Sequence, residues 1–197
     1  MLGQIFFSAY SAGAPETFET RSPTSLLVMK QTKFLRVTYD ELDKMVESLY
    51  DNMEKAGFIP DIILAIARGG WFPARVLSDI YSSKGIPVDV VSITTKFYTS
   101  IGETAKRPVL LQELSQSLFD QSTLIVDDVS DTGRTLKFIR GYVSWLGAKD
   151  ARVATVFMKP ETLVVPDFYV KEVSQDTWII FPYEIREMEF LLSKTGS

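Results

Sequence analysis

The sequence predicts an α/β fold: a doubly wound, mostly parallel sheet flanked by helices, with a small hood at the C-terminal end. Short continuous apolar runs such as residues 61–67 are typical of strands that are buried on both faces of a parallel sheet. These runs alternate along the chain with segments of helical periodicity, which favours βαβ units. The pattern becomes irregular and aromatic after Lys159, and this change predicts the hood.

The predicted elements follow one another from Thr38 onward. Thr38 and Glu41 have the spacing of a capping box, which predicts a helix start, and Gly57 is placed to end that helix. The elements expected after it are a strand at 61–67, a helix at 73–83, a strand at 88–94, a polar segment at 95–108, a strand at 123–127, a helix at 135–146 and a strand at 152–158. We divide the chain into an N-terminal extension of unknown role (1–37), an α/β core (38–159) and a hood with a tail (160–197).

Length and charge limit the class of protein. The 197 residues are 46% hydrophobic, which is enough for one substantial core and favours one domain. The net charge is 21 − 25 = −4 without a run of Lys or Arg, so we expect neither nucleic acid nor an anionic membrane as a partner. No apolar run approaches about 18 residues, and the apolar start Met1–Tyr10 lacks a basic residue. We therefore expect a cytoplasmic protein without a secretory signal.

The chain contains no cysteine and no histidine. Disulfides, thiolate nucleophiles, Ser-His-Asp triads and the common zinc sites are therefore excluded. A metal ion would need oxygen ligands, which favours Mg²⁺ or a similar hard ion. Catalysis is limited to carboxylates, lysines, arginines, hydroxyls and the backbone.

The strongest functional pattern joins an apolar strand to an acidic pair and a glycine turn. The strand runs into Asp127 and Asp128, and the string Asp131-Thr132-Gly133-Arg134-Thr135 follows at a helix start. Ligands bind beyond the carboxyl ends of such strands. Two carboxylates there suit a sugar diol and Mg²⁺, and the free amides of a helix N-terminus suit a phosphate, so the pattern predicts a ribose 5-phosphate site. Each piece alone is also compatible with a solvated strand end and an ordinary turn.

A second turn, at Arg68-Gly69-Gly70, follows the buried run 61–67. A guanidinium at this place can hold a pyrophosphate by charge-assisted hydrogen bonds, and the glycines allow backbone amides to approach. An exposed arginine in a Gly-Gly turn is the alternative.

The string from Val126 to Thr135 resembles the binding motif of the type I phosphoribosyltransferase family. The resemblance covers about residues 38–185 and implies that family's fold and its donor, phosphoribosyl pyrophosphate. The residues implied to bind this donor are Asp127, Asp128, Asp131, Thr132, Gly133, Arg134 and Thr135, with Mg²⁺ at Asp128. It also implies a pyrophosphate loop at Arg68 and Gly69, with a strained peptide between them, and a mobile lid that includes Lys96 and Tyr98.

The C-terminal part is similar to the 6-oxopurine branch of the family, especially to xanthine-guanine enzymes. By this resemblance Lys159 donates to the purine O6, Trp178 stacks on the ring, and the backbone of Ile179 contacts the base edge. The resemblance also places Asp131 at the purine N7 as general acid or base. It implies Mg²⁺-dependent transfer of a 5-phosphoribosyl group to N9 of xanthine, guanine or hypoxanthine in purine salvage, by a homodimer or homotetramer.

Two departures and three alternatives remain at this point. Ile180-Phe181 stands where the bacterial xanthine-guanine enzymes have more polar residues, and Glu184 lies near an acidic position of the family that can meet a metal. The alternatives are an enzyme for another base, a non-catalytic regulator that senses the donor and binds nucleic acid, and a donor-synthesising kinase relative. The last would need an ATP site, and no GxxxxGK[ST] or GxGxxG string is present.

Overall fold

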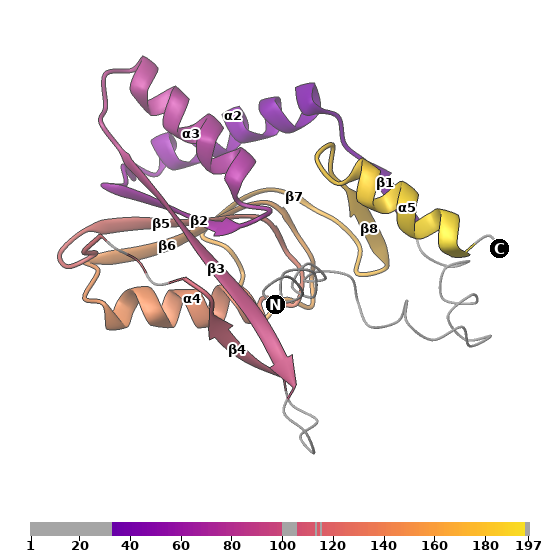
Figure 1. The fold of residues 1–197 in the computed structure, drawn as a ribbon. Coiled ribbons are helices and arrows are strands. Elements are labelled where there is room, and N and C mark those ends of the chain that lie inside the picture. The colour runs from indigo at the N-terminus through magenta and orange to yellow at the C-terminus, as the bar shows by residue number, and fades with distance from the viewer. Residues whose placement is uncertain (1–32, 100–105, 113, 115, 196–197) are drawn as a thin grey trace, which may run out of the picture.

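The computed structural model describes residues 33–99, 106–112, 114 and 116–195. Its main sheet has six strands in the order β4-β3-β2-β5-β6-β7 (Figure 1). Their bounds are Ile62–Ala67 (β2), Asp89–Thr99 (β3), Lys106–Leu110 (β4), Ser122–Ser130 (β5), Asp150–Met158 (β6) and Phe168–Glu172 (β7). All neighbouring strands are parallel except β3 and β4, which are antiparallel. The predicted mostly parallel α/β sheet is confirmed.

Helices cover both faces of this sheet. Helices α2 (Tyr39–Lys55) and α3 (Trp71–Ser83) lie on one face, and α4 (Arg134–Trp145) lies on the other (Figure 1). Along β2, Ile63 and Ala65 belong to the core beneath α2 and α3, whereas Ile62 and Leu64 belong to the core beneath α4. Successive side chains of a strand point to opposite faces, so burial on both faces requires the continuous apolar run seen in the sequence.

The helix starts depend on local signals. The capping box of α2 is confirmed, because Thr38 Oγ1 accepts from Glu41 N (3.2 Å) and Glu41 Oε2 accepts from Thr38 N (2.8 Å). Helix α3 begins at Trp71, two residues before the predicted start at Pro73. Proline is tolerated in the first turn of a helix, where its missing N–H has no partner to lose.

Two predicted strand ends were wrong. Strand β5 does not stop at Asp127 but continues to Ser130, which pairs with Met158 of β6. The strand expected at 88–94 was to end before a polar segment at 95–108, yet β3 runs to Thr99 and pairs with β4 from Thr95↔Leu110 to Thr99↔Lys106. Hydrogen bonds between two strands need no apolar face, so a polar ribbon of this kind lacks the alternation by which strands are recognised.

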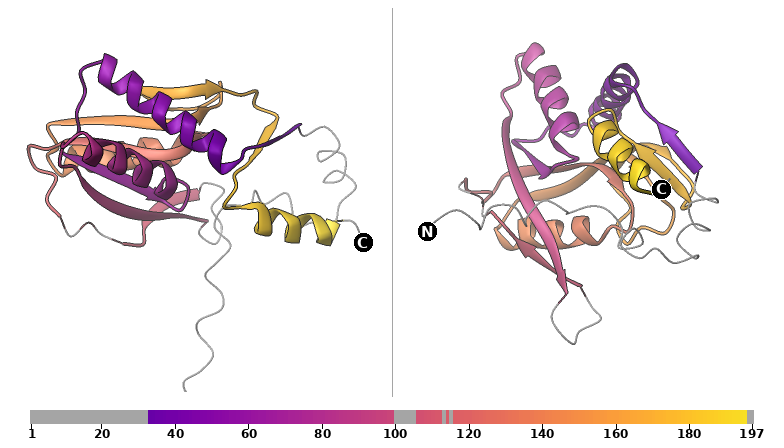
Figure 2. Two further views of the ribbon diagram at one scale, coloured as in Figure 1. Left: turned by 90° about the horizontal axis from the view of Figure 1, so that it is seen from above. Right: turned by 45° about the vertical axis from the view of Figure 1, so that its right-hand side comes forward.

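The hood contains segments from both ends of the described chain. Strand β1 (Lys33–Arg36) pairs in parallel with β8 (Thr177–Ile180), and helix α5 (Ile185–Thr195) follows. These three elements lie together at one end of the main sheet (Figure 1, Figure 2). Strand β1 falls within the expected extension 1–37, and β7 lies beyond residue 159 but belongs to the main sheet. The strand pairing therefore crosses both expected domain boundaries.

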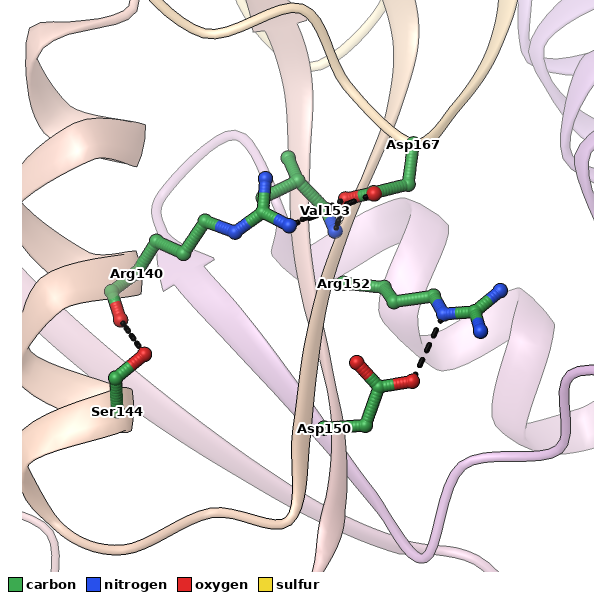
Figure 3. A network of polar contacts seen from close by, with 6 residues as sticks. All are labelled: Arg140, Ser144, Asp150, Arg152, Val153 and Asp167. Atoms are coloured by element: carbon green, nitrogen blue, oxygen red, sulfur yellow. Dashed lines mark hydrogen bonds and ion pairs between the residues drawn. The ribbon is translucent and has the colours of Figure 1, made fainter.

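Asp167 directly precedes β7, the edge strand of the main sheet, and contacts both β6 and α4. Its carboxylate accepts from Val153 N of β6 (2.8 Å) and from Arg140 of α4 (3.4 Å), as Figure 3 shows. These contacts place the start of β7 beside β6.

No helix in the part of the chain that the structure describes is long and apolar enough to cross a membrane.

Candidate active site

The candidate site lies where β2 and β5 separate. Strand β2 continues through α3 to β3 on one side, and β5 continues through α4 to β6 on the other side. The loops that follow β2 and β5 therefore leave the sheet in opposite directions, which opens a crevice at the carboxyl ends of the two strands. Pairing between β2 and β5 ends at Ala65↔Val126, whereas β5 stays paired with β6 as far as Ser130↔Met158. The acidic pair of β5 thus lies beside the gap.

The turn after β2 packs directly against β5. The peptide bond between Ala67 and Arg68 is cis, one bond before the position expected for an unusual peptide. A side chain at Gly69 would overlap the carboxylate of Asp128, and one at Gly70 would overlap the carbonyl oxygen of Val126. Both positions therefore require glycine, and the predicted pyrophosphate loop touches the predicted ribose site.

Asp127 and Asp128 lie within β5, so their side chains start from opposite faces of the strand. Asp128 is 8% exposed, and its amide donates to Asp127 Oδ1 over 3.0 Å. Burial raises the pKa of Asp127 well above its usual value, and the neighbouring charge of Asp128 adds to this shift. Burial also raises the pKa of Asp128, against hydrogen bonds that include one from Tyr183. A cation or hydroxyl donors bound here would relieve the cost of two adjacent buried charges.

Three acidic or phenolic side chains of the C-terminal segment reach the same region. Tyr183 donates to Asp128 Oδ2 over 2.8 Å, and Glu187 accepts from Arg68 over 3.0 Å. Burial, with the charges of Asp128 and Glu187, raises the pKa of Glu184 to about 7. The sequence indicated Glu184 but gave no role to Tyr183 or Glu187. The only feature of the sequence that could have indicated Tyr183 and Glu187 is their position, in an aromatic and acidic stretch that follows the expected base-binding residues.

The glycine turn after β5 is built for close backbone approach. Gly133 is the N-cap of α4 and has φ of +70°, a left-handed conformation that favours glycine. A side chain there would overlap Thr162 Oγ1, and Thr132 O accepts from Leu163 N over 3.0 Å. The first turn of α4 has no acidic residue, and no side chain caps its amides. The helix N-terminus that includes Arg134 and Thr135 therefore offers amides to an anion.

Asp131 and Lys159 come together beside this turn. Lys159 Nζ lies 3.1 Å from Asp131 Oδ1, and the lysine side chain is only 12% exposed. Gln175 Nε2 donates to the same oxygen over 3.3 Å. Gln175 begins the string Gln175–Ile179, which is part of the resemblance to the 6-oxopurine branch, but the sequence gave this residue no role of its own. Oδ1 of Asp131 is thus held by two donors.

The other predicted residues lie on strands β8 and β3. Ile179 is 8% exposed and packs in the main core, so a contact from it to a ligand has to come from its backbone. Trp178 precedes it on β8 and is half-buried on the opposite face. Lys96 and Tyr98 lie on β3, opposite Val109 and Arg107 of β4, rather than in a loop. The tip of the predicted lid, residues 100–105, lies outside the described residues.

Comparisons with known proteins agree with this geometry. The family described as "Phosphoribosyl transferase domain" matches residues 35–187. The xanthine-guanine phosphoribosyltransferase of Nitratidesulfovibrio vulgaris is 33% identical over 155 residues, covering 77% of this chain and 85% of that protein. The corresponding protein of Idiomarina loihiensis is 29% identical over 149 residues, covering 76% and 86% of the two chains. The crystal structure of a purine phosphoribosyltransferase from Pyrococcus horikoshii superposes with a TM-score of 0.67 at 36% identity, covering 77% of this chain and 93% of that one.

The match of fold, crevice and sequence leads to one conclusion about class. The chain belongs to the phosphoribosyltransferase domain family. Within this family it is a type I enzyme of the 6-oxopurine branch, in agreement with the resemblance of its Lys159 and Trp178 regions.

Substituting two glycines of the α4 region tests the glycine turn. Gly133→Ala should destabilise the protein, because the left-handed backbone alone costs roughly 1–2 kcal/mol for a residue with a side chain and the methyl group would overlap Thr162. Gly141→Ala, in the interior of α4 with open space around it, should stabilise by about 0.5–1 kcal/mol. Chemical denaturation measures both values. A Gly133→Ala protein as stable as wild type would contradict this account.

The raised pKa of Glu184 predicts a pH dependence of stability without ligands. The carboxyl has a pKa of about 7 in the folded chain against 4.5 for the unfolded reference, so the native state binds more protons between these values. The free energy of unfolding should therefore fall as pH rises from 5 to 8, and Asp127 and Asp128 act in the same direction. Glu184→Gln should flatten this slope in thermal melts with a chelator. The exposed Glu189→Gln is the control, and equal slopes in both variants would refute the assignment.

Proposed function

We propose that this protein transfers the 5-phosphoribosyl group of phosphoribosyl pyrophosphate to N9 of a 6-oxopurine and releases pyrophosphate. The observation that carries the proposal is the ion pair of Lys159 and Asp131, 3.1 Å long. Asp131 stands in the chain between the acidic pair of β5 and Gly133, so the pair joins a group suited to an oxo base with groups suited to a ribose phosphate.

The donor would be held by the loops at the carboxyl ends of β2 and β5. Asp127 and Asp128 would accept from the ribose hydroxyls, and the amides of the turn from Thr132 to Thr135 would bind the 5-phosphate. Arg68 would contact the pyrophosphate, where its charge opposes the negative charge that develops on the leaving group. Its present partner Glu187 is a surface carboxylate, and such exposed pairs contribute little stability. A polyanion can therefore replace Glu187 at little cost.

The acceptor would lie between the glycine turn and the hood. Lys159 would donate to the purine O6, Trp178 would stack on the ring, and the backbone of Ile179 would meet the base edge, as in the family. A planar base suits this arrangement, because stacking and burial bind the ring while one ammonium group selects an oxo substituent.

Asp131 would exchange the proton of the purine. Its Oδ1 is occupied by Lys159 and Gln175, so the second carboxylate oxygen is the one that we assign to the purine N7. A positioned carboxylate is sufficient for this role in a chain without histidine. The remaining contribution to the rate is the alignment of two bound substrates.

The acidic residues of the site fit Mg²⁺, which the family uses with its donor. Asp128, with Asp127 and Glu184 nearby, supplies the oxygen ligands that this ion prefers. Burial raises the pKa values of these three carboxyl groups, and a bound cation would relieve the cost of charging them. No cluster of three metal-ligating side chains occurs among the residues that the structure describes. Mg²⁺ commonly takes one or two carboxylates and completes its shell with water and substrate phosphates. When bound, it would neutralise charge on the pyrophosphate. The cytoplasmic location stays a prediction from the sequence. The homodimer or homotetramer stays a prediction from the resemblance.

Turnover with a panel of bases tests the proposed function. Pyrophosphate release should occur with xanthine, guanine or hypoxanthine in the presence of the donor and Mg²⁺. Adenine should fail, because its amino group cannot accept a hydrogen bond from Lys159. Release with none of the four bases would refute the proposal.

Replacement of Asp131 tests the proton transfer. Asp131→Asn should lower kcat by roughly 10²–10⁴-fold, which is the usual contribution of a general acid or base, while the donor still binds. Asp150→Asn is a matched control, because Asp150 pairs with Arg152 at the start of β6, at the other end of the strand from Lys159. Unchanged turnover in Asp131→Asn would remove this residue from the chemistry.

A further inference from the structure

We infer that Tyr183 is a positioning residue of the donor half of the site, through which the C-terminal hood orients Asp128 and the turn at Gly69. The resemblance gave the hood a role in binding the base and placed Glu184 near a position that can meet a metal, but it gave Tyr183 no role. The inference rests on the proposed function, since it assigns Asp128 and Gly69 to the donor.

The hydroxyl group of Tyr183 meets both donor-binding segments. It lies 2.8 Å from Asp128 Oδ2 and 3.4 Å from the carbonyl oxygen of Gly69. A phenol has one proton to donate, and the shorter contact, to a carboxylate, is the stronger bond. Because Gly69 also packs against this carboxylate, the hydroxyl group lies over the junction of the two segments.

The ring of Tyr183 is held from several sides, so the hydroxyl has a defined place. It stacks on Phe181 with ring centroids 5.3 Å apart and planes 3° apart. Phe181 is 2% exposed and packs edge-on against Phe157 of β6, with centroids 5.8 Å apart. The ring of Phe72, in the first turn of α3, has its centroid 6.4 Å from the centroid of the Tyr183 ring. The stack therefore connects the hydroxyl to the main sheet and to the helix that follows the Arg68–Gly70 turn.

This arrangement predicts which substrate depends on Tyr183. Asp128 is 8% exposed, so few water molecules can replace a lost partner for its buried oxygen. Without the hydroxyl group the carboxylate would lose one of the contacts that aim it at the ribose, and the Gly69 turn would lose one of its contacts with the hood. The Lys159–Asp131 pair has no part in these contacts. A second residue of the same segment, Glu187, accepts a hydrogen bond of 3.0 Å from Arg68. Arg68 belongs to the half of the site that we assign to phosphoribosyl pyrophosphate.

Tyr183→Phe separates the hydroxyl group from the ring, because it keeps the aromatic stack. The dissociation constant of phosphoribosyl pyrophosphate, measured by calorimetry in Mg²⁺ without a base, should rise about 10-fold, the typical effect of losing a hydrogen bond to a charged group. The KM for this donor should rise in parallel, and the KM for the purine should stay unchanged. The melting temperature should fall by no more than the few degrees that the loss of one buried hydrogen bond costs. Tyr169→Phe, on the edge strand β7, is the control and should bind the donor as wild type does.

The outcomes separate this inference from the function on which it rests. If the wild type binds the donor and Tyr183→Phe binds it with the same dissociation constant, the inference is overturned and the proposed function is not. A lower melting temperature with equal losses for donor and purine would overturn it too, since the hydroxyl group would then only stabilise the fold. A wild-type protein that binds no donor would overturn both the inference and the proposed function.

Discussion

The separation of β2 and β5 after Ala65↔Val126 is the constraint on which the site depends. Up to that point the two strands share hydrogen bonds and bury apolar side chains on both faces. Beyond it, α3 and α4 carry the chain to opposite sides, and backbone groups at the ends of the strands must find new partners. Glycines at 69, 70 and 133 let these ends pack closely without side chains between them. The polar groups that we assign to donor binding are therefore concentrated at the gap.

The electrostatics of the site follow from this placement. Two adjacent carboxylates on a strand of a buried sheet are unfavourable in the free protein, and their pKa values are raised as a result. The substrate hydroxyl groups and the cation that we propose to bind here would offset this cost. Asp131, by contrast, is exposed and is held by Lys159 and Gln175. The two halves of the site thus differ in burial as well as in the substrates that we assign to them.

The hood connects these halves. Strand β8 carries Trp178, which we assign to the base, and the chain then reaches Tyr183 and Glu187 within nine residues. Those two side chains contact Asp128 and Arg68. Strand β1 pairs with β8 along its whole length, so a segment from before the core supports the hood. One short C-terminal region therefore borders the places that we assign to both substrates.

The sequence by itself determined the parts that depend on local pattern. Continuous apolar runs identified the parallel strands, the Thr38–Glu41 spacing identified a helix start, and the absence of histidine and cysteine limited the chemistry to carboxylates and basic groups. Only the tertiary structure decided the continuation of β5 to Ser130, the β3–β4 ribbon, the pairing of β1 with β8 and the bond from Tyr183 to Asp128, 55 residues away. These features rest on hydrogen bonds between polar segments that are distant in the chain. Such bonds leave no hydrophobic period in the sequence, because a partner strand or side chain replaces the apolar face.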